Sequence, residues 1–219
     1  MPTTLVIKAL RKGCLIEVTD RIHFVKGPGM SALDFNKTVK AAKKRIEEVW
    51  ETPEFKWKCC KVKFKFEYLK DGADDADDKT LHPSNGRSTQ EGLGPGKSSG
   101  TWFVGPVGEL GGAGLPLPPD VRHAAHEVGH ELGLMDKYEA VDVKGDPVPE
   151  KVVNRDGDMV SNPKFDHYAP KGNYPKEGIM FDPPVGGLPQ QIDINEILAK
   201  LEVDCPDSCC DDATQKKKK

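Results

Sequence analysis

Three segments near the start of the chain have the pattern of strands. Residues 4–10 and 14–25 are rich in apolar side chains, and the turn sequence K-G-P-G follows the second of them. Residues 57–69 alternate strictly, with one face formed by Cys60, Val62, Phe64, Phe66 and Tyr68 and the other by Lys61, Lys63, Lys65 and Glu67. A period of two with one apolar face is typical of a half-buried strand. The pattern therefore predicts strands in all three segments.

Two other segments have apolar residues at helical spacing. The first begins at Ser31, which Asp34 follows at the third position as in a capping box, and it continues to about residue 51. Its apolar positions are Phe35, Val39, Ala42, Ile46, Val49 and Trp50. The second segment runs from Gln190 to Leu201, with Ile194, Ile197, Leu198 and Leu201 on one side. We expect a long helix after the first strands and another near the C-terminus.

The rest of the chain is more polar. Residues 70–100 contain the acidic run D-G-A-D-D-A-D-D, followed by a segment rich in Gly, Ser and Pro. This composition predicts a long flexible loop. That run, and N-R-D-G-D at 154–158, offer carboxylates to Ca²⁺ but lack the full ligand pattern of a calcium loop. Thr101–Val104 predicts a short strand, and residues 139–177 predict an irregular stretch.

Residues 123–138 read H-A-A-H-E-V-G-H-E-L-G-L-M-D-K-Y and contain H-E-x-x-H. His126 and His130 are four positions apart, so on a helix their rings lie on one face and can reach one zinc ion at about 2.0–2.1 Å. Glu127 lies beside the first ligand, where its carboxylate can take a proton from a zinc-bound water. The alternative is an amphipathic helix with solvated histidines. We expect the helix to start with Asp120 as its cap, after Pro118-Pro119, and to run to about Leu132.

The motif continues with Gly133 and Asp136 at intervals of three residues. Glycine tolerates a left-handed backbone and can end a helix with a sharp turn, which would carry Asp136 back to the metal. Catalytic zinc usually has three protein ligands and one open position. The expected ligands are His126, His130 and Asp136. His123, one turn earlier, is a neighbour or surface residue in this interpretation, with a fourth ligand as the alternative.

The sequence H-E-x-x-H-x-x-G-x-x-D resembles the metzincin metallopeptidases, in the less common version with Asp136 as third ligand. The resemblance implies a methionine turn below the metal, for which E-G-I-M-F-D with Met180 is the candidate. Many metzincins have a tyrosine two residues later, but this chain has Asp182. The donor to the oxyanion therefore stays unassigned among Tyr138, Tyr168, Tyr174 and His167.

The same resemblance implies an α+β, zincin-like catalytic domain. It would have a mixed twisted sheet, a long N-terminal helix, an active-site helix and a C-terminal helix. It would span residues 1–204, leaving 205–219 as a cysteine-containing tail that ends in a lysine run. In this layout the strand at 101–104 would be the sheet edge to which an extended substrate adds.

Composition is compatible with one domain of 219 residues. A net charge of −3 does not indicate a protein that binds nucleic acid, which would need a clearly basic surface. No apolar segment approaches the length of a membrane span. The N-terminus lacks the pattern of a standard secretory signal, which leaves a cytoplasmic protein or one exported by another route. Oligomeric state cannot be inferred.

Six cysteines include two adjacent pairs, Cys59-Cys60 and Cys209-Cys210. A disulfide from the first pair to Cys205, Cys209 or Cys210 would fix the end of the chain to the sheet, and free thiols are the alternative. A structural zinc on C-P-D-S-C-C is disfavoured, because the usual paired C-x-x-C spacing is missing.

These features together predict a zinc-dependent metalloendopeptidase that acts on a peptide or protein substrate. Two other interpretations remain open. One is a catalytically weak or inactive metal-binding module for protein interaction, suggested by Asp182. The other is a zinc hydrolase of non-peptide amides.

Overall fold

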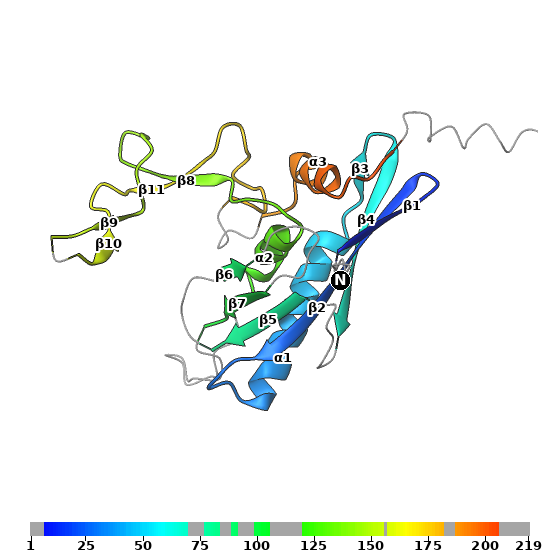
Figure 1. Cartoon of the computed structure of the whole chain (residues 1–219), viewed down its shortest axis with the longest axis horizontal. Helices are drawn as coiled ribbons and strands as arrows, with labels where there is room; N and C mark the ends of the chain where they lie inside the picture. Colours follow the sequence, from blue (N-terminus) through cyan, green and yellow to red (C-terminus); the bar gives the residue numbers. More distant parts are fainter. Residues whose placement is uncertain are drawn as a thin grey trace, which may run out of the picture.

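The computed structural model describes residues 7–69, 77–83, 89–91, 99–105, 120–155, 157–181 and 187–205. These residues form an α+β structure in which helices pack on a mixed seven-stranded sheet (Figure 1). One cluster of buried apolar residues reaches from Ile7 to Cys205. The combination of helices and a mixed sheet agrees with the predicted α+β class.

The sheet has the strand order β3-β4-β2-β5-β7-β6, with β1 also paired to β2. The strands are β1 (Lys8–Lys12), β2 (Leu15–Lys26), β3 (Phe55–Trp57), β4 (Cys60–Leu69), β5 (Asp77–His82), β6 (Thr89–Glu91) and β7 (Ser99–Phe103). Strands β4, β2, β5 and β7 run parallel to one another, while β1, β3 and β6 are antiparallel to their neighbours. Along the same strand, β2 pairs first with β1 and then with β5.

The expectation that residues 101–104 form the edge of the sheet is wrong at Thr101, while Trp102 and Phe103 pair only with β5 among the described strands. Strand β7 lies between β5 and β6, and β6 pairs with Ser99–Thr101 on its outer side. The sequence signal for β6 is weak because this strand has only three residues.

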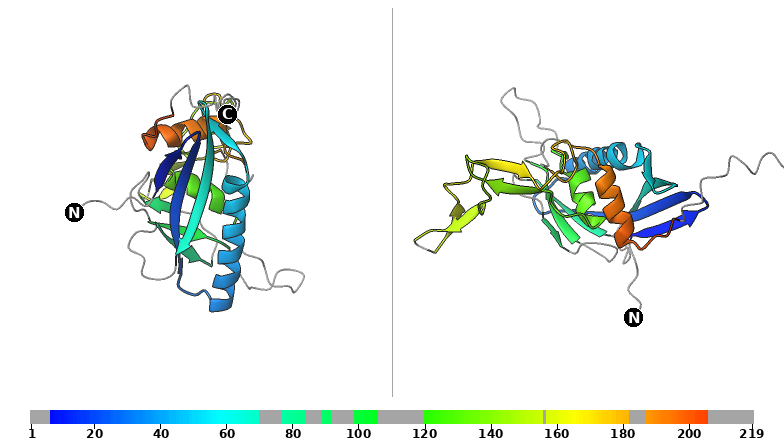
Figure 2. Two further views of the ribbon diagram at one scale, coloured as in Figure 1. Left: turned by 90° about the vertical axis from the view of Figure 1, so that its right-hand side faces the viewer. Right: turned by 90° about the horizontal axis from the view of Figure 1, so that it is seen from above.

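The long N-terminal helix is confirmed, as α1 (Ala32–Ile46) continued by a π-helical turn η1 (Glu47–Glu51). Ser31 caps it, since its Oγ accepts a hydrogen bond from Asp34 N–H at 3.1 Å. The helix runs along the strands (Figure 2). At its end the buried indole of Trp50 donates to the carbonyl of Ala125 at 2.8 Å, which links this helix to the metal-motif helix described below.

The predicted strand at 57–69 is confirmed from Cys60 onward but not before it. Residues 58–59 form the turn of a β3–β4 hairpin, with Trp57 opposite Cys60 and Lys58 at a φ of 51°. In the sequence the apolar residues occupy odd positions up to Cys59 and even positions from Cys60 onward, so the alternation changes phase at this turn. From Cys60 to Phe66 the apolar side chains are buried and the lysines are exposed, as predicted.

The predicted loop at 70–100 is wrong for the parts that the structure describes. Strands β5, β6 and the start of β7 fall within it, and β5 pairs with β2 and β7. The inward-facing residues of β5 are Lys79 and Leu81, both fully buried. With a lysine at an inward position, β5 lacks the apolar alternation by which a strand is recognised. The acidic run before it shows no such alternation either.

Residues 139–177 are also more regular than predicted. They contain β8 (Tyr138–Val141), β9 (Lys151–Val153), β10 (Met159–Ser161) and β11 (His167–Pro170), which form two two-stranded sheets. This part extends away from the main sheet (Figures 1 and 2). Asn154 closes the β9–β10 turn by accepting the N–H of Asp158 at 2.8 Å.

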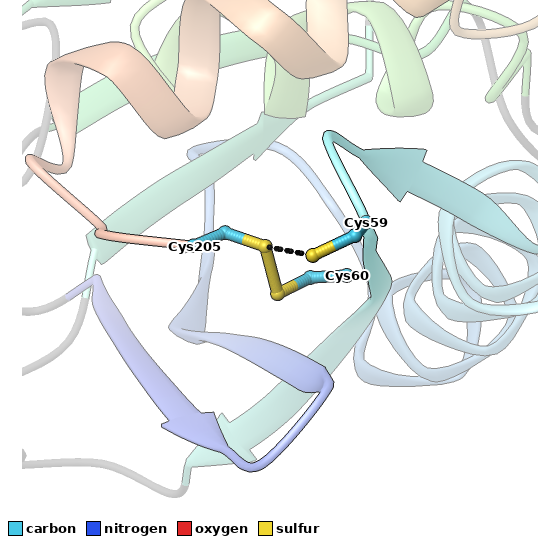
Figure 3. Close-up of side chains that lie close together, drawn as sticks. All are labelled: Cys59, Cys60 and Cys205. Atoms are coloured by element: carbon cyan, nitrogen blue, oxygen red, sulfur yellow. Dashed lines mark hydrogen bonds between the residues drawn. A yellow bond between two sulfur atoms is a disulfide. The ribbon is translucent and has the colours of Figure 1, made fainter. Parts of the chain in front are cut away.

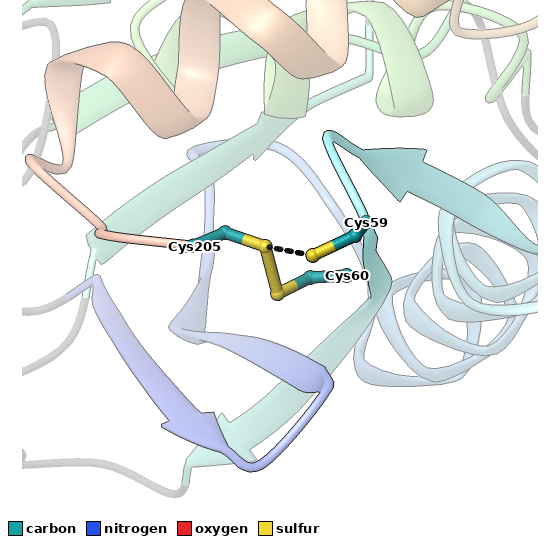
Figure 4. The surroundings of a disulfide bond; sticks show 3 residues. All are labelled: Cys59, Cys60 and Cys205. Carbon is teal, nitrogen blue, oxygen red and sulfur yellow. Dashed lines mark hydrogen bonds between the residues drawn. A yellow bond between two sulfur atoms is a disulfide. The ribbon is translucent and has the colours of Figure 1, made fainter. Parts of the chain in front are cut away.

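The C-terminal helix is confirmed as α3 (Gln191–Lys200), which begins with a capping box between Gln190 and Asp193. Figure 3 shows the disulfide between Cys60 and Cys205 that follows it, with Cys59 Sγ 3.5 Å from Cys205 Sγ. The expected tie between the first cysteine pair and the C-terminal segment is therefore present (Figure 4). Cys209, Cys210 and the lysine run lie outside the described residues.

The three sulfurs lie close enough to hold a metal ion, but all three cysteines are disulfide-bonded and none offers a thiolate. None of the helices in the described part of the chain has the length and apolarity needed to cross a membrane.

Candidate metal centre

The motif lies on α2 (Ala124–Glu131), a short helix that is buried over most of its length. The expected start at Asp120 is wrong. The Asp120 carboxylate accepts instead from the guanidinium of Arg122, at 2.6 and 2.9 Å, and the N-cap is His123, whose side chain makes no capping bond. The helix ends at Leu132 as expected. Pro118 and Pro119 lie outside the described residues.

Both histidine rings of the motif are fixed through their Nδ1 atoms. His126 Nδ1 lies 2.8 Å from the carbonyl oxygen of Ile179, and His130 Nδ1 lies 2.9 Å from that of Leu134. Because a carbonyl oxygen only accepts, each Nδ1 must carry a proton. In a neutral ring the lone pair then lies on Nε2, which is the arrangement that metal-binding histidines require.

Gly133 and Asp136 lie as the sequence predicts. Gly133 has a φ of 96°, which the absence of a side chain permits, and its N–H donates to the carbonyl of His130 at 2.9 Å. The chain then turns back, so that Asp136 Oδ1 is 3.3 Å from His126 Nε2 and 3.4 Å from His130 Nε2. The possible ligand atoms of these three residues lie within 4.8 Å of one another. His123 is not a member of this group.

The donor set fits a cation. Within the described part of the chain, the buried Asp136 Oδ1 meets no hydrogen-bond donor in suitable geometry, although two ring nitrogens lie beside it. Burial alone would raise the pKa of Asp136, but the two imidazoles hold this pKa well below its usual range. Burial lowers the pKa of His130, yet Asp136 and the Leu134 carbonyl outweigh this effect and raise it. Three electron-pair donors converge here, so a proton or a metal ion must lie between them.

Asp136→Ala is expected to weaken zinc binding by more than about tenfold, because two imidazoles alone leave the usual set of three ligands incomplete. The fold should survive, since the Asp136 side chain is partly exposed. Calorimetric titration with zinc measures the effect, and Asp166→Ala, at an exposed carboxylate, is the matched control. Equal zinc affinity in the two variants would remove Asp136 from the ligand set.

Glu127 lies on the same helix but outside the ligand group. Only 5% of it is exposed, and burial raises the pKa of its carboxyl. A carboxyl with a raised pKa beside a metal site suits a group that takes and returns a proton.

Met180 lies directly below the motif. The segment Gly178–Phe181 forms a turn, closed by a hydrogen bond from Phe181 N–H to the carbonyl of Gly178 at 3.1 Å. Met180 is fully buried, and its sulfur would collide with a Cβ placed on Gly129. Position 129, which faces this sulfur, therefore requires a very small residue. Asp182 lies outside the described residues.

Gly129→Ala is expected to destabilise the protein by about 1–3 kcal/mol through overpacking against Met180. At a helical glycine with open space around it, the same change would stabilise by up to about 1 kcal/mol. Urea unfolding of Gly129→Ala, Met180→Ala and the double variant measures the coupling. The added methyl group should cost less in the Met180→Ala background, and a stabilising Gly129→Ala would contradict the contact.

Sequence reasoning did not identify how the methionine turn is held. The buried hydroxyl of Tyr174 accepts the N–H of Met180 at 3.1 Å and donates to Asp193 Oδ2 at 2.8 Å. A side chain on Gly178 would collide with the Tyr174 ring. Tyr174 was one of four candidate oxyanion donors, but its hydroxyl is used within the fold. No sequence pattern distinguishes these two roles.

The other three candidates lie in the β8–β11 region. The rings of Tyr138 and Tyr168 pack against each other with centroids 4.9 Å apart, while His167 is exposed and bonds to Asp166 at 2.8 Å. The oxyanion donor therefore stays unassigned.

A buried ion pair lies at the end of the metal-motif helix. Glu131 directly follows His130, and its Oε1 is 3.1 Å from Lys79 Nζ on β5. Both side chains are completely buried. The pair joins the last turn of α2 to the sheet.

The chain matches no protein-family model, no curated protein and no solved structure. Fold and site together define an α+β protein with a candidate His-His-Asp metal centre, and its function is inferred from its own residues.

Proposed function

We propose that the chain is a zinc-dependent metalloendopeptidase of the metzincin type. The observation that carries the proposal is the convergence of two Nε2 lone pairs and the Asp136 carboxylate beside Glu127, on a helix with a buried methionine below it. Two nitrogen ligands and one oxygen ligand suit zinc, and a set of three leaves a position for reaction. The resemblance of the motif to metzincins supports the choice of peptide bonds as substrate.

His126, His130 and Asp136 would hold the ion. When bound, zinc would polarise the scissile carbonyl and lower the pKa of a water molecule toward about 7. Glu127 would accept a proton from the attacking water as the water oxygen bonds to the carbonyl carbon, and would pass this proton to the leaving amine nitrogen as the C–N bond breaks. The Ile179 and Leu134 carbonyls keep the two rings in the tautomer that this arrangement needs.

The test uses the full chain loaded with zinc and an unfolded, alkylated protein as substrate, with the fragments read by mass spectrometry. We expect new internal cleavage sites that disappear when a chelator removes the metal and return when zinc is added back. Cleavage that continues at full rate after the metal is gone would refute the proposal.

The same experiment separates the other interpretations. A panel of non-peptide amides, cleaved while peptides are not, would identify a different zinc hydrolase. Tight zinc binding without turnover of either class would identify a metal-binding interaction module. The presence of Glu127 on the motif helix favours an enzyme over such a module.

A further inference from the structure

The third ligand lies on a segment without regular secondary structure. Residues 133–137 connect the end of α2 to β8 and contain no helix or strand. A metal ligand must be held within a fraction of an ångström, and irregular backbone alone does not supply that rigidity. Part of the support comes from the backbone: the N–H of Lys137 donates to the carbonyl of Met180 at 2.8 Å, and the carbonyl of Lys137 accepts from the N–H of Lys171 at 2.8 Å. Side chains from other elements add to these bonds.

One carboxylate on α3 is linked to both ends of the segment, directly at Lys137 and through Lys200 at Gly133. Glu196 Oε2 accepts from Lys137 Nζ at 2.5 Å, and Lys137 directly follows Asp136. Glu196 Oε1 accepts from Lys200 Nζ at 2.9 Å, and the same ammonium donates to the carbonyl of Gly133. Each oxygen of Glu196 thus has its own lysine, and each lysine fixes one end of the segment.

The Lys137–Glu196 contact is better shielded than an ordinary surface ion pair. The side chains of Lys137 and Glu196 are 21% and 25% exposed. Burial opposes ionisation of Glu196, but its two lysine partners hold the pKa of this carboxyl below its usual value, so it is charged at neutral pH. Charge-assisted hydrogen bonds of this kind are stronger than neutral ones.

The helix that carries Glu196 is itself anchored. Its first turn is fixed by the capping box of Gln190 and Asp193, and the chain after its last turn is tied to β4 by the Cys60–Cys205 disulfide. Asp193 also receives the hydroxyl of Tyr174, which binds the methionine turn. The helix therefore joins the third-ligand segment and the methionine turn to one rigid support.

The geometry points to Glu196 as a positioning residue of the metal centre, which holds Asp136 in place through Lys137 and Lys200. The inference rests on the metal site of the proposed function and does not depend on the peptidase reaction. In the described part of the chain the Glu196 carboxylate is bound by Lys137 and Lys200 rather than by the proposed ligands, so its effect is on the geometry and affinity of the site.

The test compares Glu196→Gln with wild type for zinc affinity, by competition with a chromogenic chelator, and for the absorption spectrum of the Co²⁺-substituted protein. We expect zinc binding about 10-fold weaker and changed Co²⁺ bands, because outer residues of metal sites have effects of about 10–100-fold. Glu48→Gln is the matched control. It breaks another helical Lys–Glu pair, Lys44–Glu48 at 3.7 Å, far from the ligands in the sequence.

A merely structural role predicts something else. Glu196→Gln would then lower the stability of the metal-free protein to urea, while the folded fraction would keep the zinc affinity and Co²⁺ spectrum of wild type. That result would overturn the inference. If Glu196→Gln does not fold, Lys200→Met replaces it. It removes the donor to Gly133 at a side chain that is 41% exposed, and unchanged zinc affinity there would also overturn the inference.

The outcomes for the two proposals are distinguishable. Wild-type protein that binds zinc without cleaving peptides would refute the peptidase while the role of Glu196 is still measured by zinc affinity. Peptide cleavage by wild type, together with zinc affinity that Glu196→Gln and Lys200→Met leave unchanged, would refute the positioning role alone.

Discussion

Replacing Glu127 by alanine is expected to leave zinc bound while peptide cleavage falls by a factor of about 10²–10⁴, the usual contribution of a general base. Glu127 is separate from the three proposed ligands, so its removal leaves the donor set intact. Its carboxyl is buried, and burial raises its pKa. Loss of turnover without loss of metal is therefore the signature of its role.

Two measurements on the same samples test this expectation. Zinc content and affinity come from chelator competition, and cleavage comes from the rate of fragment formation under single-turnover conditions. Glu127→Gln should behave like Glu127→Ala, because an amide keeps the shape of the side chain but takes up no proton. Glu48→Ala, at an exposed carboxylate on the η1 turn that continues α1, should cleave like wild type. A Glu127→Ala variant as active as this control would exclude Glu127 as the base.

The candidate site could be predicted from the sequence because its determinants are local. His126, Glu127 and His130 lie on one helix, and Gly133 permits the turn that brings Asp136 to them. Each relation follows from helix geometry over a few residues. The long N-terminal helix was predictable for the same reason, since its apolar positions and its cap at Ser31 lie within one continuous segment.

The parallel strands beyond β4 were not predictable in the same way. Strand β5 pairs with β2, more than fifty residues earlier in the chain, and its inward position at Lys79 is charged. A strand can be recognised from its period of two only when its inward residues are apolar, so the sequence of β5 predicted a loop. Strand β6 has only three residues and gives no pattern, so the sequence did not predict that a further strand pairs with Ser99–Thr101 of β7.

The residues that support the site were also outside the reach of local patterns. Tyr174, Glu196 and Lys79 act on the motif through contacts with segments distant in the sequence. The sequence left a tie from the first cysteine pair to the C-terminal segment open beside free thiols, and the structure was needed to show a disulfide between Cys60 and Cys205. The proposed metal ligands and the proposed base were thus easier to recognise in the sequence than the residues that hold them in place.

Lys79→Met is expected to destabilise the protein by about 3–5 kcal/mol, as breaking one side of a buried ion pair usually does. The Glu131 carboxylate would remain completely buried without the ammonium that now lies 3.1 Å away. Methionine keeps most of the volume of lysine, so the loss reflects charge more than packing. The double variant Lys79→Met, Glu131→Leu removes both charges and should recover most of the stability.

Urea unfolding of the two single variants and the double variant gives the coupling energy between the side chains. A double variant no more stable than Lys79→Met would show that the cost arises from packing and not from an unpaired charge. Because Glu131 directly follows His130, the pair also holds the end of the helix that presents both histidines. Zinc affinity should therefore fall in Lys79→Met and return in the double variant, which links the stability of the core to the geometry of the metal centre.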